Sequence, residues 1–449
     1  MWEDDEVRDI SYFMEYVDEN DTWIAVDQIH AGVGTSSDPG LKHSSQGGYT
    51  GSGVKIGIIE AGSGVYDTDN PQLKSLHNSG QLSQVAVSGV IATTSDHATL
   101  VTTIVCGEAK SAWFRPDTEG IATDATVYQS PIRTSTHTYT AFQQFADLNV
   151  DVINYSAGSA TSTYTSYDRE IDNLIYTTKI VFIKSAGNTS GNISSPGKAY
   201  NAITVGNAKT KSAMFTGLNP PYDMSASSSH DVPSYMSNKP EVVAPGTHIA
   251  YNLGIWSSGS NSGTSFAAPM VTGIVAQLME KRKTMVNVNN YITYFKAVMI
   301  LGAEEDKIND NETRTDDPDT FFNVSGAGLV NAVKSSVAGE TQIYRSLNTM
   351  YYSVKTLFSG SVSHDFRFVL VFEKPEDMDI TAAYENDFDL VMTRVSDQAE
   401  LDSSRSDINT FEILECTTPL GVEVLIGFET QSIISSDLEM SISCVWNTL

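Results

Sequence analysis

The stretch Gly263-Thr264-Ser265-Phe266-Ala267-Ala268-Pro269 separates a polar, glycine-rich run at 257–263 from an apolar run at 270–279. This change in composition predicts a buried helix that begins close to Ser265. Backbone N–H groups at a helix N-terminus favour negative charge, so a hydroxyl there suits a nucleophile whose attack creates an oxyanion. It suits an ordinary helix cap equally well. Pro269 is expected near the first turn, where its missing N–H costs little.

The length, composition and charge of the chain exclude several classes of protein and partner. The chain has 449 residues, 40% of them hydrophobic and 18% charged, which indicates a globular protein of two or three domains. The net charge of −28 argues against nucleic acid or an anionic membrane as a partner. No apolar run approaches the roughly 18 residues that a membrane-spanning helix needs. We therefore expect no membrane span. We also expect a monomer.

The N-terminus and the cysteines bear on the compartment. Residues 1–22 form an acidic extension that lacks the features of a signal peptide. We expect the processed, mature form of an extracellular protein, with a cytoplasmic protein as the alternative. The three cysteines, Cys106, Cys416 and Cys444, match no zinc spacing. Cys416 and Cys444 could form a disulfide, and free buried thiols are an equal alternative.

Residues 23–340 alternate between strand-like and helix-like runs. The predicted strands are 54–59, 125–128, 150–154, 180–183 and 202–205, and the predicted helices include 98–106, 139–148 and 168–178. This alternation is typical of an α/β fold, in which a mostly parallel sheet carries helices on both faces. Ligand chemistry in such a sheet belongs at the carboxyl ends of the strands.

The pattern changes at about residue 340. Runs at 366–372, 388–392, 422–426 and 440–443 are strand-like and are separated only by turns. Residues 341–449 are therefore predicted to form a C-terminal antiparallel β-sandwich with jelly-roll character.

Three polar residues stand where the α/β pattern predicts the working edge of the sheet. Glu60 follows the first predicted strand, and His97 and Ser265 each open a predicted helix. A serine hydroxyl becomes a nucleophile when an imidazole takes its proton, and the imidazole needs a carboxylate to fix its tautomer. Asn188 lies in a glycine turn after the strand at 180–183, where its amide could donate to an oxyanion.

These residues lie in blocks that resemble the subtilase family of serine peptidases over roughly residues 23–336. The block around Ser265 resembles the family's nucleophile motif, and His97-Ala98-Thr99-Leu100-Val101 is similar to its His-Gly-Thr-His-Val block, apart from Ala98 and Leu100. Further blocks follow in the family's order at 120–125, 195–198, 241–246 and 326–332. The resemblance implies a subtilisin-like fold and a serine endopeptidase that works through an acyl-enzyme.

Glu60 is the main departure, because the family has an aspartate at this position. Three interpretations remain open. A Glu60-His97-Ser265 triad could work as it stands, or a nearby aspartate such as Asp67 or Asp69 could take over. Alternatively, the chain could be a catalytically impaired pseudoprotease that still binds peptides.

The resemblance also implies where a substrate would lie. Two segments, Ser156-Ala157-Gly158 and Ser185-Ala186-Gly187, are expected to pair with an extended peptide through their backbones. Lys184 replaces a small apolar residue; reaching into the pocket, it would favour an acidic side chain, although strand alternation directs it away from Ser185. Catalysis needs no cofactor, and a structural calcium ion is expected from the family, although no metal ligands can be named. The family's prodomain is not evident in residues 1–22.

Overall fold

The computed structural model describes most of the chain in separate ranges. These are residues 29–31, 39–108, 119–209, 222–234, 236–247, 249–252, 258–285, 292–309, 324–337, 341–344, 351–358, 363–374, 388–406, 409–430 and 442–448. The predicted acidic extension at 1–22 and the predicted start of the catalytic domain at residue 23 lie outside these ranges.

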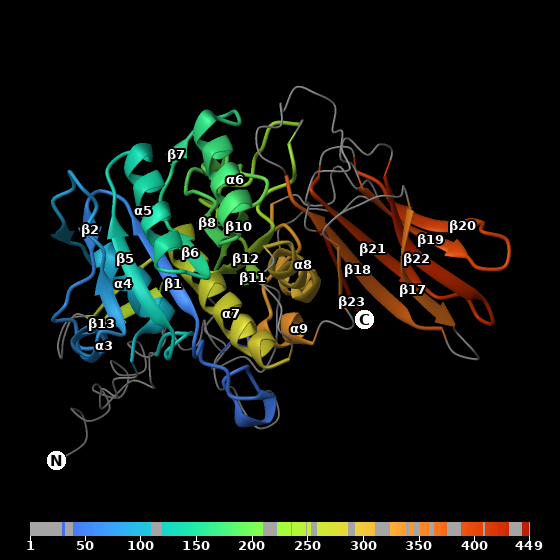
Figure 1. Cartoon of the computed structure of the whole chain (residues 1–449), viewed down its shortest axis with the longest axis horizontal. Coiled ribbons are helices and arrows are strands. Elements are labelled where there is room, and N and C mark those ends of the chain that lie inside the picture. Colours follow the sequence, from blue (N-terminus) through green and yellow to red (C-terminus); the bar gives the residue numbers. More distant parts are fainter. Residues whose placement is uncertain are drawn as a thin grey trace, which may run out of the picture.

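A parallel seven-stranded sheet forms the centre of the larger unit (Figure 1). Its strands lie in the order β12 (Val242–Pro245), β10 (Ile203–Ala208), β8 (Val181–Ser185), β6 (Val152–Tyr155), β1 (Lys55–Glu60), β5 (Thr126–Pro131) and β3 (Leu82–Gln84). All these pairings are parallel. Strands buried on both faces need near-continuous apolar sequence, which explains runs such as 54–59. The predicted α/β sheet is confirmed.

Helices cover both faces of this sheet. They are α3 (Lys74–Ser79), α4 (Asp96–Cys106), α5 (Ser135–Asp147), α6 (Ser166–Thr178), α7 (Thr264–Met285), α8 (Ile292–Gly302) and α9 (Ala332–Ser336). Helices α4 and α7 pack against each other, and α7 crosses β6, β8, β10 and β12. Helix α5 instead packs against β1, β5 and α6. Gly57 on β1 lets Phe145 of α5 approach closely, since a Cβ there would lie 2.5 Å from the ring.

The larger unit also contains short strand pairs and two 3₁₀ turns. The parallel pairs are β2 (Gly64–Val65) with β4 (Thr93–Thr94) and β11 (Tyr222–Asp223) with β15 (Ile308–Asn309). The antiparallel pairs are β7 (Ser159–Ala160) with β9 (Ser194–Ser195) and β13 (Ile249–Asn252) with β14 (Ser258–Asn261). The 3₁₀ turns are η1 (Ser44–Gln46) and η2 (Glu305–Lys307).

The C-terminal unit consists of two antiparallel four-stranded sheets. One contains, in order, β16 (Thr341–Tyr344), β23 (Ile442–Thr448), β18 (Asp365–Phe372) and β21 (Phe411–Thr417). The other contains β17 (Tyr351–Phe358), β22 (Glu423–Thr430), β19 (Phe388–Arg394) and β20 (Glu400–Ser404). The predicted separate antiparallel β domain is confirmed, whereas residue 340, the predicted end of the preceding domain, lies outside the described residues.

The cysteines of this domain are free. Cys416 on β21 and Cys444 on β23 are both buried and unbridged. Strand β18 lies between their strands. The backbones of the two cysteines are therefore two strand spacings apart, or about 10 Å. This distance is beyond the reach of a disulfide.

Helix α8 joins the two units, because it packs against α9 of the larger unit and against β18 and β23 of the C-terminal unit (Figure 1). Side chains alternate along β18, so that Val369 and Val371 belong to the main core while Phe368, Leu370 and Phe372 fill the sandwich. This double burial explains why the strand is apolar at consecutive positions.

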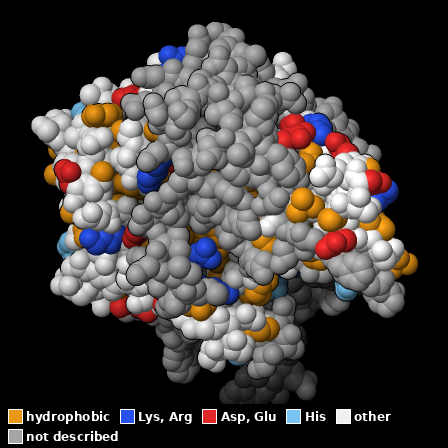
Figure 2. All heavy atoms as spheres, turned by 45° about the vertical axis from the view of Figure 1, so that its right-hand side comes forward, with side chains coloured by type: hydrophobic (Ala, Val, Ile, Leu, Met, Phe, Trp, Pro, Cys, Tyr) orange, Lys and Arg blue, Asp and Glu red, His pale blue; other side chains and the backbone are white. Residues whose placement is uncertain are grey.

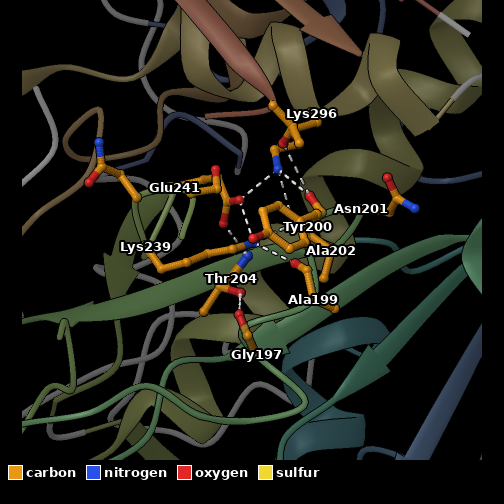
Figure 3. A network of polar contacts seen from close by, with 12 residues as sticks. Gly197, Ala199, Tyr200, Asn201, Ala202, Thr204, Lys239, Glu241 and Lys296 are labelled. Atoms are coloured by element: carbon orange, nitrogen blue, oxygen red, sulfur yellow. Dashed lines mark hydrogen bonds and ion pairs between the residues drawn. The ribbon is translucent and has the colours of Figure 1, made fainter. Parts of the chain in front are cut away.

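A buried charged cluster lies close to this junction (Figure 3). The Glu241 carboxylate accepts from Lys239 Nζ at 2.5 Å and from Lys296 Nζ of α8 at 2.7 Å. Its second oxygen accepts from the backbone N–H of Thr204 at 2.8 Å. Burial lowers the pKa of Lys239 to about 8, although the Glu241 charge opposes this shift. The cluster ties β10, the segment before β12 and α8 together.

Figure 2 shows one face of the molecule, with side chains of both charges and hydrophobic side chains among them. On the face in Figure 2, acidic and basic side chains are interspersed, and the basic ones drawn there form no continuous patch. None of the helices in the described ranges is long and apolar enough to cross a bilayer.

Candidate active site

Glu60 and His97 meet at the carboxyl edge of the sheet. Glu60 is the last residue of β1, and His97 is the second residue of α4, whose N-cap Ser95 accepts from the backbone of Ala98. The distance from His97 Nδ1 to Glu60 Oε1 is 2.7 Å. Because a carboxylate can only accept, Nδ1 carries the proton and Nε2 is left as the basic nitrogen.

The Glu60 side chain is closely surrounded. A Cβ on Gly64 would lie 3.1 Å from Glu60 Cγ, so the glycine allows the two segments to approach closely. The second oxygen, Oε2, is buried without a hydrogen-bond partner among the described residues. The Glu60 side chain is 6% exposed and that of His97 36% exposed. The carboxylate is thus shielded while the imidazole stays open to a substrate.

The two aspartates considered as alternatives have other partners. Asp69 forms an exposed ion pair with Lys74 at 2.8 Å, and Asp67 accepts from the backbone N–H of Asp69 at 2.9 Å. The carboxylate that contacts His97 is that of Glu60.

Opposing influences act on the protonation of His97. Burial favours the neutral ring, whereas the hydrogen bond to Glu60 and the charge of Glu60 favour the imidazolium. The contributions from Glu60 prevail, so the pKa of His97 lies above its ordinary value. The arrangement stabilises the charged imidazolium that forms when His97 accepts a proton.

Ser265 is the second residue of α7 and exchanges two hydrogen bonds with Ser156. Ser265 Oγ donates to the Ser156 carbonyl at 3.2 Å, and Ser156 Oγ donates to the Ser265 carbonyl at 2.8 Å. In this structure, which describes all the residues concerned, the Ser265 hydroxyl therefore does not donate to His97. It would have to turn about its Cα–Cβ bond before passing a proton to the imidazole, as catalytic hydrogen bonds commonly do only on substrate binding.

The second of these bonds explains how α7 tolerates a proline. Because α7 begins at Thr264, Pro269 lies in the second turn, and the expectation of a first-turn proline is wrong. Its missing N–H would have bonded the carbonyl four residues earlier, that of Ser265. Ser156 Oγ supplies that hydrogen bond instead.

A buried polar chain fixes Ser156 in turn. Asn154 on β6 donates through Nδ2 to Ser156 Oγ at 3.0 Å, and Thr272 on α7 donates to Asn154 Oδ1 at 3.1 Å. The end of β6 is thereby fastened to the first turns of α7. Sequence reasoning missed Asn154 and Thr272; the only available signal was an asparagine inside an otherwise apolar strand.

Asn188 follows β8 and lies against the start of α7. Its Oδ1 accepts from the backbone N–H of Thr264 at 2.9 Å and from the Thr264 hydroxyl at 3.2 Å. These bonds fix the amide so that its Nδ2 remains as the donor. A Cβ on Gly263 would lie 3.2 Å from Nδ2, so a glycine is needed beside it. Thr264, which orients the amide, was not predicted from the sequence.

His97 and the start of α7 are in contact. The ring of His97 packs against that of Phe266, the residue after Ser265, with 5.5 Å between centroids. The structure thus brings Glu60 to His97, His97 to Phe266, and Asn188 and Ser156 to the first turn of α7.

The two predicted substrate segments lie on neighbouring strands. Ser156-Ala157-Gly158 follows β6, and Ser185-Ala186-Gly187 spans the end of β8 and the turn after it. The pair β7–β9 connects them on one side, because Ser194 on β9 also donates its backbone N–H to the Ala186 carbonyl at 2.8 Å. Gly158 is exposed, whereas Ser156 and Ser185 are buried.

Among the described residues, no group of three or more His, Cys, Asp or Glu side chains could hold a metal ion. No residue is therefore assigned to the expected calcium ion.

Comparison with known proteins is consistent with this geometry. The profile of the Subtilase family (Peptidase S8) matches residues 51–328. Subtilisin E of Bacillus subtilis strain 168 is 29% identical over 253 residues, which cover 54% of this chain and 59% of that protein. Pyrolysin of Pyrococcus furiosus is 32% identical over 158 residues, or 30% of this chain and 11% of that protein. The chain thus spans less than two thirds of the length of these relatives.

Solved structures are also similar. The patellamide maturation protease PatA is 17% identical with a TM-score of 0.49, covering 64% of this chain and 96% of that structure. A cold-adapted subtilisin-like serine proteinase is 20% identical with a TM-score of 0.45, covering 63% and 90%. Since the family profile spans more than half of the sequence, this chain belongs to the subtilase family.

Proposed function

We propose that the protein is a serine endopeptidase that cleaves peptide bonds through an acyl-enzyme on Ser265. The observation that carries the proposal is the 2.7 Å hydrogen bond between His97 Nδ1 and Glu60 Oε1, which leaves Nε2 as a base. Ser265 stands at the start of α7, where the helix dipole favours the negative charge that its attack creates.

In the first half of the reaction, the Ser265 hydroxyl turns from the Ser156 carbonyl towards His97. Nε2 takes the proton as Oγ attacks the peptide carbonyl carbon, and Glu60 stabilises the imidazolium that forms. The carbonyl oxygen becomes an oxyanion and accepts a hydrogen bond from Asn188 Nδ2.

In the second half, the tetrahedral intermediate collapses and the C–N bond breaks. The imidazolium of His97 gives its proton to the leaving amine, so that an ester on Ser265 and a free amino terminus result. A water molecule then attacks the ester with His97 as the base, and the acid product and the Ser265 hydroxyl are released.

A peptide-library assay tests this proposal. The wild-type protein and Ser265→Ala are each incubated with a library of defined peptides, and products are identified by mass spectrometry. We expect cleavage by the wild-type protein alone. An intact library with the wild-type protein, or equal cleavage by Ser265→Ala, would contradict the proposal.

A further inference from the structure

A lysine lies buried beside the predicted substrate segments. Lys184 is on β8, directly before Ser185, and is fully buried. Its Nζ donates to the carbonyl of Ser185, to Ser185 Oγ at 3.2 Å and to Ser194 Oγ at 3.1 Å. The ammonium therefore curls back towards Ser185, although its Cβ points to the opposite side of the strand.

The ammonium lies between the two segments. A Cβ on Gly158 would be 3.1 Å from Lys184 Nζ and 2.7 Å from Ser194 Oγ. Because residue 158 is a glycine, no side chain there separates Lys184 Nζ from the segment 156–158. Ser185, to which Nζ donates, belongs to the segment 185–187. The amino group lies directly behind the backbone on which a substrate is proposed to lie.

No carboxylate among the described residues pairs with Lys184. Two other deeply buried lysines differ: Lys239 and Lys296 share Glu241 at 2.5 and 2.7 Å. Burying an unpaired ammonium is costly, and proteins normally supply a counter-charge. The missing counter-charge points to an anion that arrives with the ligand.

Three ionisable groups surround Lys184. Asp168 comes from α6, Lys198 from the segment after β9, and Tyr155 ends β6 with its ring centroid 5.8 Å from Nζ. Asp168 is already bonded to the Lys198 backbone N–H at 3.1 Å and to the hydroxyl of Ser195 at 2.6 Å. The pKa of Lys184 is lowered to about 7, mainly by burial; Asp168 opposes this shift and the charge of Lys198 adds to it.

Ser185 offers a second donor at the same place. Its Oγ accepts from the ammonium, and within the described chain its own proton has no acceptor. A carboxylate entering here would displace one of the three acceptors of the ammonium, and it would then receive one charged hydrogen bond from Lys184 and one neutral hydrogen bond from Ser185.

We propose that Lys184 and Ser185 form a specificity site for an acidic side chain, with glutamate as the fitting residue. This inference rests on the proposed function, because it uses Asn188 to place the substrate. Because the segment 185–187 ends directly before Asn188, the residue whose carbonyl Asn188 holds would place its side chain beside the segments at 156–158 and 185–187. Because Nζ lies behind the backbone, the longer glutamate reaches it better than aspartate does.

The first test compares two fluorogenic peptides that differ only by Glu or Gln before the cleaved bond. The ratio of their kcat/KM values cancels the ionisation of His97, since both substrates need the same base. We expect the wild-type enzyme to prefer Glu by about tenfold to a hundredfold at about pH 6. The ratio should fall towards one as the pH rises through about 7, because Lys184 then loses its proton in the free enzyme.

Two variants locate the effect. Lys184→Met should abolish the preference for Glu over Gln. Lys198→Gln is the matched control, because it removes a neighbouring positive charge whose Nζ instead contacts Thr161 Oγ1 at 2.9 Å and the Ile193 carbonyl. It should keep the preference. Equal cleavage of both peptides by the wild-type enzyme, or a preference that survives in Lys184→Met, would overturn the inference.

A binding measurement separates this inference from the proposed function. The same Glu and Gln sequences, acetylated and amidated at their ends, are titrated into Ser265→Ala by calorimetry. Tighter binding of the Glu peptide supports the specificity site even if the wild-type protein cleaves nothing, in which case only the proposed function fails. Equal affinities overturn the specificity site even if the wild-type protein is an active peptidase.

Discussion

The carboxylate of Glu60 lies 2.7 Å from Nδ1 of His97 and leaves Nε2 of the imidazole without a contact to this acid. The longer acid therefore makes the contact that an orienting carboxylate must make. Gly64 lies beside this side chain, where a Cβ would be 3.1 Å from Glu60 Cγ. Glutamate at this position is compatible with a working triad, and the kinetic consequences can be measured.

Replacing Glu60 by Gln should lower kcat by about 10⁴, the loss seen when an orienting carboxylate becomes an amide in a Ser-His-Asp triad. The acid limb of the kcat/KM profile should also move. In the wild-type enzyme it should lie above the ordinary histidine pKa, because Glu60 raises the pKa of His97. In Glu60→Gln, burial still lowers the pKa of His97, and the charge of Glu60 that opposed this effect is gone. The acid limb should therefore shift to lower pH.

Glu60→Asp is the matched control, since it keeps the charge and shortens the reach. Its kcat should fall between those of the wild-type enzyme and Glu60→Gln, and its acid limb should stay closer to the wild-type position. Full activity in Glu60→Gln would show that another group orients His97.

Asn188→Ala should lower kcat by about 10²–10³ with a smaller change in KM, because the amide stabilises the oxyanion and not the ground state. Thr264→Val is the control for orientation. It removes the hydroxyl contact to Asn188 Oδ1 at 3.2 Å and keeps the backbone contact at 2.9 Å. We expect a loss of about tenfold or less for this variant. A loss in Asn188→Ala confined to KM would argue against an oxyanion role.

The sequence motifs pointed to the candidate catalytic residues. They did not reveal the residues that hold those side chains in place. Glu60, His97, Asn188 and Ser265 were identifiable because each lies next to glycine or alanine blocks at predicted element ends. Thr264, Asn154 and Gly64 act only through contacts made in the folded chain. Ser156 and Ser265 are 109 residues apart, and no local pattern reveals that one hydroxyl replaces the N–H missing from Pro269.

The fold, too, was predicted from the sequence only in part. The strand expected at 54–59 is found at Lys55–Glu60, and the helix expected at 168–178 begins at Ser166 behind a Thr165–Asp168 capping box. Helix α8 was not predicted, because nearly all its residues are buried and it shows no polar face. Helix α8 is buried against strands of the C-terminal domain. A local sequence pattern does not reveal contacts with such distant residues.

Ser156 and Pro269 should be coupled in stability. Ser156→Ala leaves the Ser265 carbonyl without its donor and should reduce the free energy of unfolding by about 1–3 kcal/mol. In a Pro269→Ala background, the restored N–H can bond that carbonyl, so the same substitution should cost less. Urea unfolding of the four proteins completes the double-mutant cycle. Equal costs of Ser156→Ala in both backgrounds would contradict this account of the proline.

The buried cluster at the domain junction should respond sharply to the loss of its carboxylate. Glu241→Gln leaves two buried ammonium groups without their counter-charge and should cost about 3–5 kcal/mol in the free energy of unfolding. Asp69→Asn is the matched control, because the Asp69–Lys74 pair has side chains 80% and 57% exposed. It should change stability by less than about 1 kcal/mol. Equal effects of the two variants in thermal or urea unfolding would refute the role of Glu241.

The central claim is that Ser265 is a nucleophile activated by His97. The most direct measurement is covalent labelling of the folded protein by a fluorophosphonate probe, followed by peptide mapping in a mass spectrometer. We expect one adduct on Ser265, none in Ser265→Ala, and much slower labelling in His97→Ala. An unlabelled Ser265 in the folded wild-type protein would contradict the claim and leave a peptide-binding subtilase without catalytic chemistry.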